Sequence, residues 1–198
     1  MQGSGVEHSE NLKVQNIDLS KEKVAEPFNA WRVHEGYFAV ETYSSAWPYI
    51  VTYGLDSCKE IAIYNANNKK GAVCHLAMVH DLDAVVNGLV TEFGGDLTLS
   101  EAFVVVGTHQ VANRDTKSLA NLFGRGEKYY WPTGNQLIET LGKFNPNSLS
   151  VDKNYGKHPR GITLNLENGQ LKEIDNAKIW SWSRKQNISG NKTVDSID

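Results

Sequence analysis

Hydrophobic and polar positions alternate along the first half of the chain in the way that β-strands require. The segment WRVHEGYFAVET, residues 31–42, predicts a first strand with a glycine irregularity at Gly36, and YIVTYG predicts a short second strand. Two further apolar runs follow, CKEIAIYN and GAVCHLAMV, and the polar NANNKK between them has the composition of a turn. The pattern therefore predicts four strands, of which the last two form a hairpin.

The pattern then becomes helical at DLDAVVNGLVTEFGG. Its apolar residues recur at i, i+3, i+4 and i+7, Asp81 or Asp83 can cap its start, and Gly94–Gly95 can end it. Further along, EAFVVVGT is an unbroken apolar run, which predicts a strand buried on both faces. Helical patterns follow around residues 115–123 and 134–144.

The last third of the chain returns to strand patterns. RGITLNLENGQLKEID predicts a hairpin that turns at Asn168–Gly169, and AKIWSWS alternates like an edge strand. This order of elements predicts an α/β or α+β fold of a single domain, layered around one sheet. Residues 1–30 are polar and predict a flexible N-terminal arm, residues 31–183 contain the domain, and residues 184–198 predict a polar C-terminal tail.

Composition narrows the possible functions. The net charge is −3 and the pI about 6.1, so no basic field favours nucleic acid or an anionic membrane. No apolar run approaches the ~18 residues of a membrane span, and the N-terminal residues lack the apolar core of a signal peptide. We therefore expect no nucleic-acid partner, no membrane insertion and a cytoplasmic location, where cysteines stay reduced.

The predicted hairpin brings candidate chemistry together. A symmetric turn centred between Ala66 and Asn67 would pair Cys58 directly with His75, at a Cβ separation of about 4.5–5.5 Å. Side chains alternate faces, so Cys74 would point away from His75 into an apolar layer as a structural thiol. Thr52, six residues before Cys58, can bring a hydroxyl to the same place.

A cysteine beside a histidine has a chemical use. The imidazole can lower the pKa of the thiol, and the imidazolium can then protonate a leaving amine or ammonia. The alternative is that Cys58 is an ordinary core thiol and Thr52 simply a residue that favours strands. No Cys/His spacing matches a zinc site, so we expect no metal and no organic cofactor.

The stretch VTYGLDSCKEIAIYNANNKKGAVCHLAMV resembles the CheD family, the chemoreceptor glutamine deamidases of bacterial chemotaxis. The matching residues are Thr52, Gly54, Leu55, Ser57, Cys58, Gly71 and His75. The resemblance covers roughly residues 31–175 and implies a layered α/β/α sandwich around a mixed, largely antiparallel sheet. It also implies Cys58 as nucleophile, His75 as base and Thr52 as the third catalytic residue. Next to them, Ser57, Asp56 and Gly54 are the candidate residues that support the site, and backbone N–H groups near Ser57 and Cys58 could hold the oxyanion.

By this resemblance the activity is hydrolysis of a protein glutamine amide to glutamate and ammonia, with a chemoreceptor as substrate. Some bacterial toxins use a similar Cys–His core on host proteins, so a secreted effector that deamidates a host protein is one alternative. A thiol peptidase or a transglutaminase is another, because a thioester can pass to water or to an amine. A non-catalytic binding module is a further alternative, supported by Asp56, which replaces the family's glycine and places a carboxylate beside the thiol.

Overall fold

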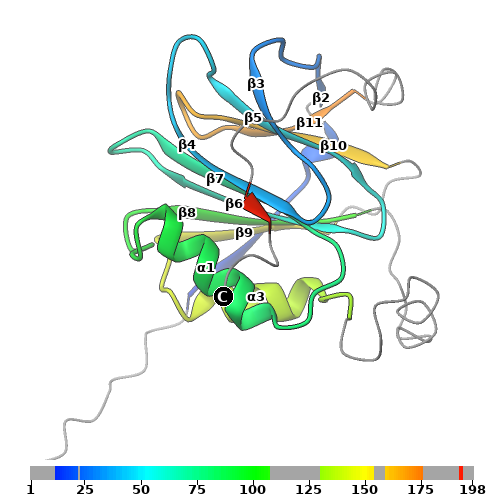
Figure 1. The fold of residues 1–198 in the computed structure, drawn as a ribbon, viewed down its shortest axis with the longest axis vertical. Coiled ribbons are helices and arrows are strands. Elements are labelled where there is room, and N and C mark those ends of the chain that lie inside the picture. The colour runs from blue at the N-terminus through cyan, green and yellow to red at the C-terminus, as the bar shows by residue number, and fades with distance from the viewer. Residues whose placement is uncertain (1–11, 22, 108–129, 154–158, 176–191, 194–198) are drawn as a thin grey trace, which may run out of the picture.

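Two β-sheets stacked face to face form the body of the protein (Figure 1). The computed structural model describes residues 12–21, 23–107, 130–153, 159–175 and 192–193. Two α-helices lie within these residues, and both cover the outer face of the larger sheet. The helix predicted around 115–123 and the strand predicted at AKIWSWS fall outside the described residues.

The larger sheet has seven strands in the order β1-β9-β8-β6-β7-β4-β12. Their bounds are β1 (Val14–Ile17), β4 (Tyr37–Thr42), β6 (Lys59–Asn65), β7 (Lys70–Leu76), β8 (Glu101–Val106), β9 (Ser148–Asp152) and β12 (Lys192–Thr193). The sheet is mixed, because β9 runs parallel to both β1 and β8 while the other pairs are antiparallel.

The smaller sheet has five strands in the order β2-β11-β10-β5-β3. Their bounds are β2 (Lys23–Val24), β3 (Ala30–Val33), β5 (Tyr49–Leu55), β10 (Arg160–Asn165) and β11 (Leu171–Ile174). The predicted hairpin of β10 and β11 is confirmed, and Gly169 in its turn has a φ of 75°. A short 3₁₀ helix, η1 (Leu19–Lys21), lies between β1 and β2 in the chain.

The predicted helix at residues 82–95 is confirmed as α1 (Leu82–Phe93). The Asp81 side chain accepts a hydrogen bond from the Ala84 amide at 3.0 Å, and Gly94 ends the helix with a φ of 137°. The pattern at 134–144 is also confirmed, as α3 (Gly134–Gly142). There Thr133 and Gln136 form a reciprocal capping box, which fixes where the helix begins.

The predicted α/β/α layering is wrong, whereas the mixed sheet is confirmed. The layers are helices, the seven-stranded sheet and then the five-stranded sheet, so a sheet occupies the place of the second helical layer (Figure 1). The segment predicted as one strand around Gly36 divides into β3 and β4, which belong to different sheets. Gly36 has a φ of 80°, a value that glycine adopts without strain, and the chain changes sheets there.

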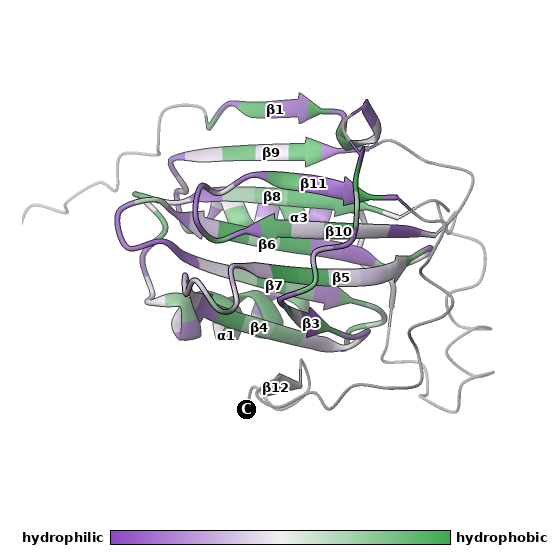
Figure 2. Cartoon of the chain, turned by 90° about the horizontal axis from the view of Figure 1, so that it is seen from above, coloured by the Kyte–Doolittle hydropathy of each residue, from purple (hydrophilic) through white to green (hydrophobic). Residues whose placement is uncertain are grey.

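The two large hydrophobic cores of the described residues follow from this layering. One fills the space between α1, α3 and the seven-stranded sheet, and it contains Cys74 with Ala72 and Leu76. The other fills the space between the two sheets, and it contains Cys58 with Ala62 and other apolar residues of both sheets. Figure 2 shows hydrophobic residues along the strands of both sheets. The candidate chemistry therefore has to be sought between the sheets.

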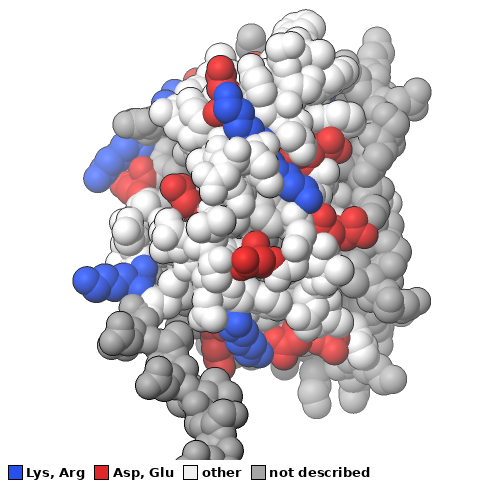
Figure 3. All heavy atoms as spheres, turned by 90° about the vertical axis from the view of Figure 1, so that its left-hand side faces the viewer, with Lys and Arg blue, Asp and Glu red and all other residues white. Residues whose placement is uncertain are grey.

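The ends of the described chain belong to the sheets. Residues 1–30 were predicted to be an arm, but β1 and β2 lie in this range, so the boundary at residue 30 is too late. In the predicted tail, Lys192–Thr193 pairs with β4. The face drawn in Figure 3 has acidic and basic side chains interspersed, in keeping with the small net charge. Among the described residues, no helix is long and apolar enough to cross a membrane.

Candidate functional site

Thr52 and His75 meet between the two sheets. Thr52 lies in β5 of the smaller sheet and His75 in β7 of the larger one, and both side chains are buried. The Oγ1 of Thr52 is 2.7 Å from Nδ1 of His75 and 2.9 Å from the backbone oxygen of Val33. The structure therefore brings together two of the three residues predicted to be catalytic, from strands of different sheets.

These two contacts determine which nitrogen of His75 holds the proton. A hydroxyl has one proton, and Thr52 donates it to the carbonyl of Val33, which cannot donate in return. The Thr52 oxygen must then accept from Nδ1–H of His75, which leaves Nε2 with a lone pair. Among the described residues, Nε2 has no hydrogen-bond partner. His75 is thus arranged to accept a proton at Nε2.

Burial, and secondarily the nearby His34, lowers the pKa of His75 to about 4. Taking an imidazolium out of water is costly, so the neutral ring dominates at neutral pH. A neutral imidazole is the form that a general base needs, but a pKa this low makes it a weak base.

The hairpin of β6 and β7 has a different register from the predicted one. Its turn comprises residues 66–69, with Lys69 in the left-handed region at a φ of 51°, and Asn65 pairs with Lys70. His75 therefore lies opposite Glu60, and the prediction that it lies opposite Cys58 is wrong by two positions. An even shift keeps every side chain on its face. Cys58, just before β6, accordingly still belongs to the core between the sheets.

The environment of Cys58 opposes a thiolate. The residue is 4% exposed, and burial raises the pKa of its thiol to about 12, with the charges of Glu35 and Asp56 acting in the same direction. Lys59 and a hydrogen bond from Ser57 act in the opposite direction with smaller effect. The expected lowering of this pKa by His75 is therefore wrong for the free protein. The thiol of Cys74 is also buried, and burial raises its pKa too.

Two glycines shape the segment that leads to Cys58. Gly54 has a φ of 76° and lies in a β-bulge of β5, where one extra residue disturbs the pairing with β10. Its carbonyl accepts a hydrogen bond from the amide of Asp56 at 2.8 Å. Gly107, directly after β8, donates its amide to the carbonyl of Cys58 at 3.1 Å, and a Cβ there would collide with the backbone oxygen of Asp56.

Glu60 is a buried carboxyl group that the sequence analysis did not select. It is 0% exposed, and neither carboxyl oxygen has a hydrogen-bond partner among the described residues. Burial raises its pKa to about 8, although Arg160 acts to lower it. The signal in the sequence was a lone glutamate in the apolar run CKEIAIYN, but its position opposite His75 depended on the register.

Arg160 forms the centre of a buried ionic cluster beside Glu60. Its Nη2 is 2.6 Å from Asp152 and its Nε is 2.8 Å from Glu173, while Nη1 donates to the carbonyl of Val106 at 3.2 Å. Lys23 adds a contact to Glu173 at 2.9 Å. The cluster joins β9, β10 and β11 at one end of the space between the sheets.

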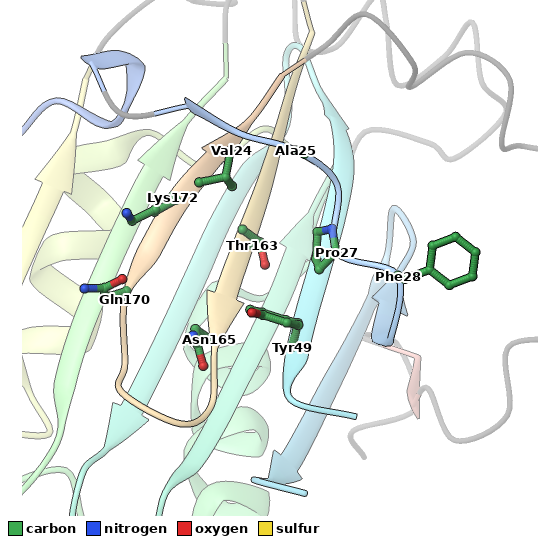
Figure 4. A pocket seen from close by; sticks show the side chains of 9 residues that line it. All are labelled: Val24, Ala25, Pro27, Phe28, Tyr49, Thr163, Asn165, Gln170 and Lys172. Atoms are coloured by element: carbon green, nitrogen blue, oxygen red, sulfur yellow. The ribbon is translucent and has the colours of Figure 1, made fainter. Parts of the chain in front are cut away.

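A pocket of about 380 Å³ lies elsewhere, on the outer face of the five-stranded sheet (Figure 4). Thr163 and Tyr49 line it, together with Pro27 and the exposed Phe28. Thr52 lies three residues after Tyr49 and faces the core between the sheets, so this pocket is on the other side of the sheet. Within the described residues, no cluster of His, Cys, Asp or Glu side chains could hold a metal ion.

Comparisons with known proteins leave the family open. No protein-family model matches the chain, and no curated protein matches it. Among solved structures, it is similar to Neisseria meningitidis protein NMB0706, family model DUF152, with a TM-score of 0.41 and 8% identity. The similarity covers 62% of each chain, so this chain spans less than two thirds of that neighbour's length. The resemblance to CheD proteins rests on the motif residues alone.

Proposed function

We propose that this protein is a cysteine-dependent amidohydrolase that converts glutamine side chains of a partner protein to glutamate, with release of ammonia. The observation that favours this function is the hydrogen bond between Thr52 and His75, which leaves Nε2 of a buried imidazole ready to accept a proton. Cys58, directly before β6, belongs to the core between the same two sheets. The chemoreceptor deamidases, which the motif residues resemble, use this combination of residue types.

In the proposed reaction the sulfur of Cys58 attacks the amide carbon of the glutamine, and the thiol proton moves to Nε2 of His75. The imidazolium then protonates the amide nitrogen, the C–N bond breaks and ammonia leaves, so that a thioester remains. His75 next takes a proton from water, whose oxygen attacks the thioester and releases glutamate and the thiol. Backbone amides near Ser57 and Cys58 would hold the oxyanion, which typically contributes ~3–4 kcal/mol per donor.

The raised pKa of Cys58 requires that the thiol is activated only when substrate is present. At pH 7 a thiol with a pKa of about 12 is ionised in roughly one molecule in 10⁵. Direct transfer of the proton to Nε2 in the transition state avoids a free thiolate. Thr52 supports this transfer because it holds the imidazole in the tautomer that accepts at Nε2.

The same pKa favours a second candidate, a non-catalytic binding module. A buried, protonated cysteine with two carboxylates nearby is the expected environment of a structural thiol. In that case Thr52 and His75 would serve to join the two sheets. The two functions differ in whether Cys58 is needed for any covalent change in a partner.

Mass spectrometry of candidate substrates tests the proposal. Cytoplasmic helices of chemoreceptors, or the proteins of a host-cell lysate, are incubated with the wild type, Cys58→Ser, His75→Ala or Cys74→Ser. We expect about one mass unit added per modified glutamine with the wild type and Cys74→Ser, and none with Cys58→Ser. Modified receptors indicate a chemotaxis role, and modified host proteins indicate an effector. Glutamate formation that persists in Cys58→Ser would overturn the proposed function.

A further inference from the structure

Glu60 faces His75 across two paired strands, and the proposed reaction gives it no role. The two residues are directly opposed in the β6–β7 register, where Cβ atoms lie about 4.5–5.5 Å apart. Directly opposed side chains lie on the same face of a sheet, here the one that Ala62 and Val73 turn toward the smaller sheet. The exposed fractions are 0% for Glu60 and 1% for His75, so both side chains are shielded from bulk solvent.

Both side chains have unused hydrogen-bonding atoms. Among the described residues, both carboxyl oxygens of Glu60 and Nε2 of His75 have no partner. Buried polar atoms in native proteins nearly always have one, because an unpaired group keeps its full desolvation cost. One water molecule between the Nε2 of His75 and the carboxyl group of the opposed Glu60 would give both groups a hydrogen-bond partner.

The charges around Glu60 explain why it would hold a proton. Arg160 faces it from β10, but this guanidinium already has Asp152 of β9 and Glu173 of β11 as ion-pair partners. A third carboxylate beside one arginine would be poorly compensated. From β7, Glu60 meets the neutral ring of His75, and Cys58 precedes it in the chain as a neutral thiol.

We propose that Glu60 is a positioning residue of the candidate site, whose carboxyl group is coupled to Nε2 of His75 through one bridging water molecule. While Glu60 is protonated, the water bridge from its carboxyl group and the S–H of Cys58 compete for the single lone pair of Nε2. When Glu60 has lost its proton to solvent, its carboxylate becomes the counter-ion of the imidazolium that forms as Cys58 transfers its proton. This role in the reaction rests on the proposed function, whereas the coupling does not.

Nuclear magnetic resonance of the wild type tests this coupling without any variant. Protein labelled with ¹³C at the glutamate carboxyl and histidine ring carbons is titrated from pH 5 to 9.5. We expect one carboxyl signal and the ring signals of His75 to shift together, with a common midpoint near pH 8. Ring signals of His75 that stay constant while the Glu60 carboxyl titrates would overturn the proposal.

Variants then test whether Glu60 causes the step near pH 8 in the ring signals of His75. Glu60→Gln keeps the shape and removes the proton, so the ring signals of His75 should lose the step near pH 8, and Glu60→Asp should retain a step. Glu41→Gln is the matched control, because Glu41 is a glutamate of the adjacent β4 that lies opposite Gly71 and not His75. A step that persists in Glu60→Gln, or disappears in Glu41→Gln, contradicts the assignment to Glu60.

The rate of Cys58 alkylation tests the role in proton transfer. In the wild type the rate should rise more than tenfold per pH unit around pH 8, whereas in Glu60→Gln it should follow only the tenfold rise per pH unit that ionisation of the thiol gives. Equal pH profiles in the two proteins would overturn the positioning role. If the titrations are coupled but no substrate is ever deamidated, the water-mediated coupling is supported and the proposed function fails on its own.

Discussion

The unfolding free energy of Glu60→Gln, measured relative to that of the wild type, should increase as pH increases. The buried carboxyl group has a pKa of about 8 in the folded protein, against an ordinary value of 4.5 in the unfolded chain. The folded state therefore favours the protonated form. Its contribution to stability is fully present below pH 4.5 and is lost as pH rises through 8. Glutamine has no such proton, so its contribution does not change over this range.

The magnitude follows from linkage. Between the two pKa values the wild type loses about 1.4 kcal/mol of unfolding free energy per pH unit because of this group. Between pH 5 and pH 7.5 the difference between Glu60→Gln and the wild type should therefore grow by about 3 kcal/mol. Solvent does not screen this effect, because Glu60 is 0% exposed. Any pH-independent difference in unfolding free energy between glutamine and protonated glutamate adds the same amount at every pH, so it does not change this slope.

Urea unfolding at pH 5, 6, 7 and 7.5, followed by tryptophan fluorescence, measures this slope. Glu41→Gln is again the control: burial raises the pKa of Glu41 as well, but this side chain is only half-buried, so its slope should be smaller. If the unfolding free energies of Glu60→Gln and the wild type stay parallel across the four pH values, then Glu60 is ionised in the folded protein and the reasoning is refuted.

Three further predictions concern the residues around Cys58. Without substrate, Cys58 should react with iodoacetamide very slowly at pH 7 and about tenfold faster per pH unit toward pH 10, and fast labelling at pH 7 would contradict its raised pKa. Gly107→Ala should lower the unfolding free energy by roughly 2 kcal/mol or more, measured by urea unfolding, because its Cβ meets backbone atoms and not a movable side chain. Thr52→Val should reduce deamidation at least tenfold and move the His75 ring proton away from Nδ1 in ¹⁵N spectra, and an unchanged tautomer would contradict the assignment.

Local signals in the sequence predicted the elements that local physics determines. Helix α1 has a regular apolar stripe, a capping aspartate and a glycine pair at its end, and each of these acts within a few residues. The same holds for the hairpin of β10 and β11, whose turn glycine has a positive φ. The layers could not be predicted in this way. An apolar sheet face can be covered by helices or by another sheet, and the strand pattern is the same in both cases.

The register of β6 and β7 shows the same division between local and non-local information. Sequence predicts that NANNKK turns, but not which residues close it, and the left-handed Lys69 moves the centre by one residue. This error leaves the face of each side chain unchanged, so the assignment of Cys74 to an apolar layer is correct. The predicted cross-strand partner of His75 is wrong, because His75 lies opposite Glu60 and not opposite Cys58. Glu60 was missed because a shift of two positions exchanges the neighbour across the ladder while every face stays the same.

No sequence motif predicts the electrostatics of the site, because the pKa values there depend on residues of several elements. The pattern around Cys58 resembles that of enzymes that ionise a thiol, yet burial, Glu35 and Asp56 hold this one in its neutral form. His75 is neutral for the same physical reason, so the resting pair is uncharged. A charge can then form only where something compensates it. Ionised Glu60 would compensate the imidazolium, and a bound amide between backbone donors would accept the negative charge that leaves the sulfur. A site built in this way would react with its own substrate and leave other electrophiles largely untouched, because the charges would be stabilised only in the complex.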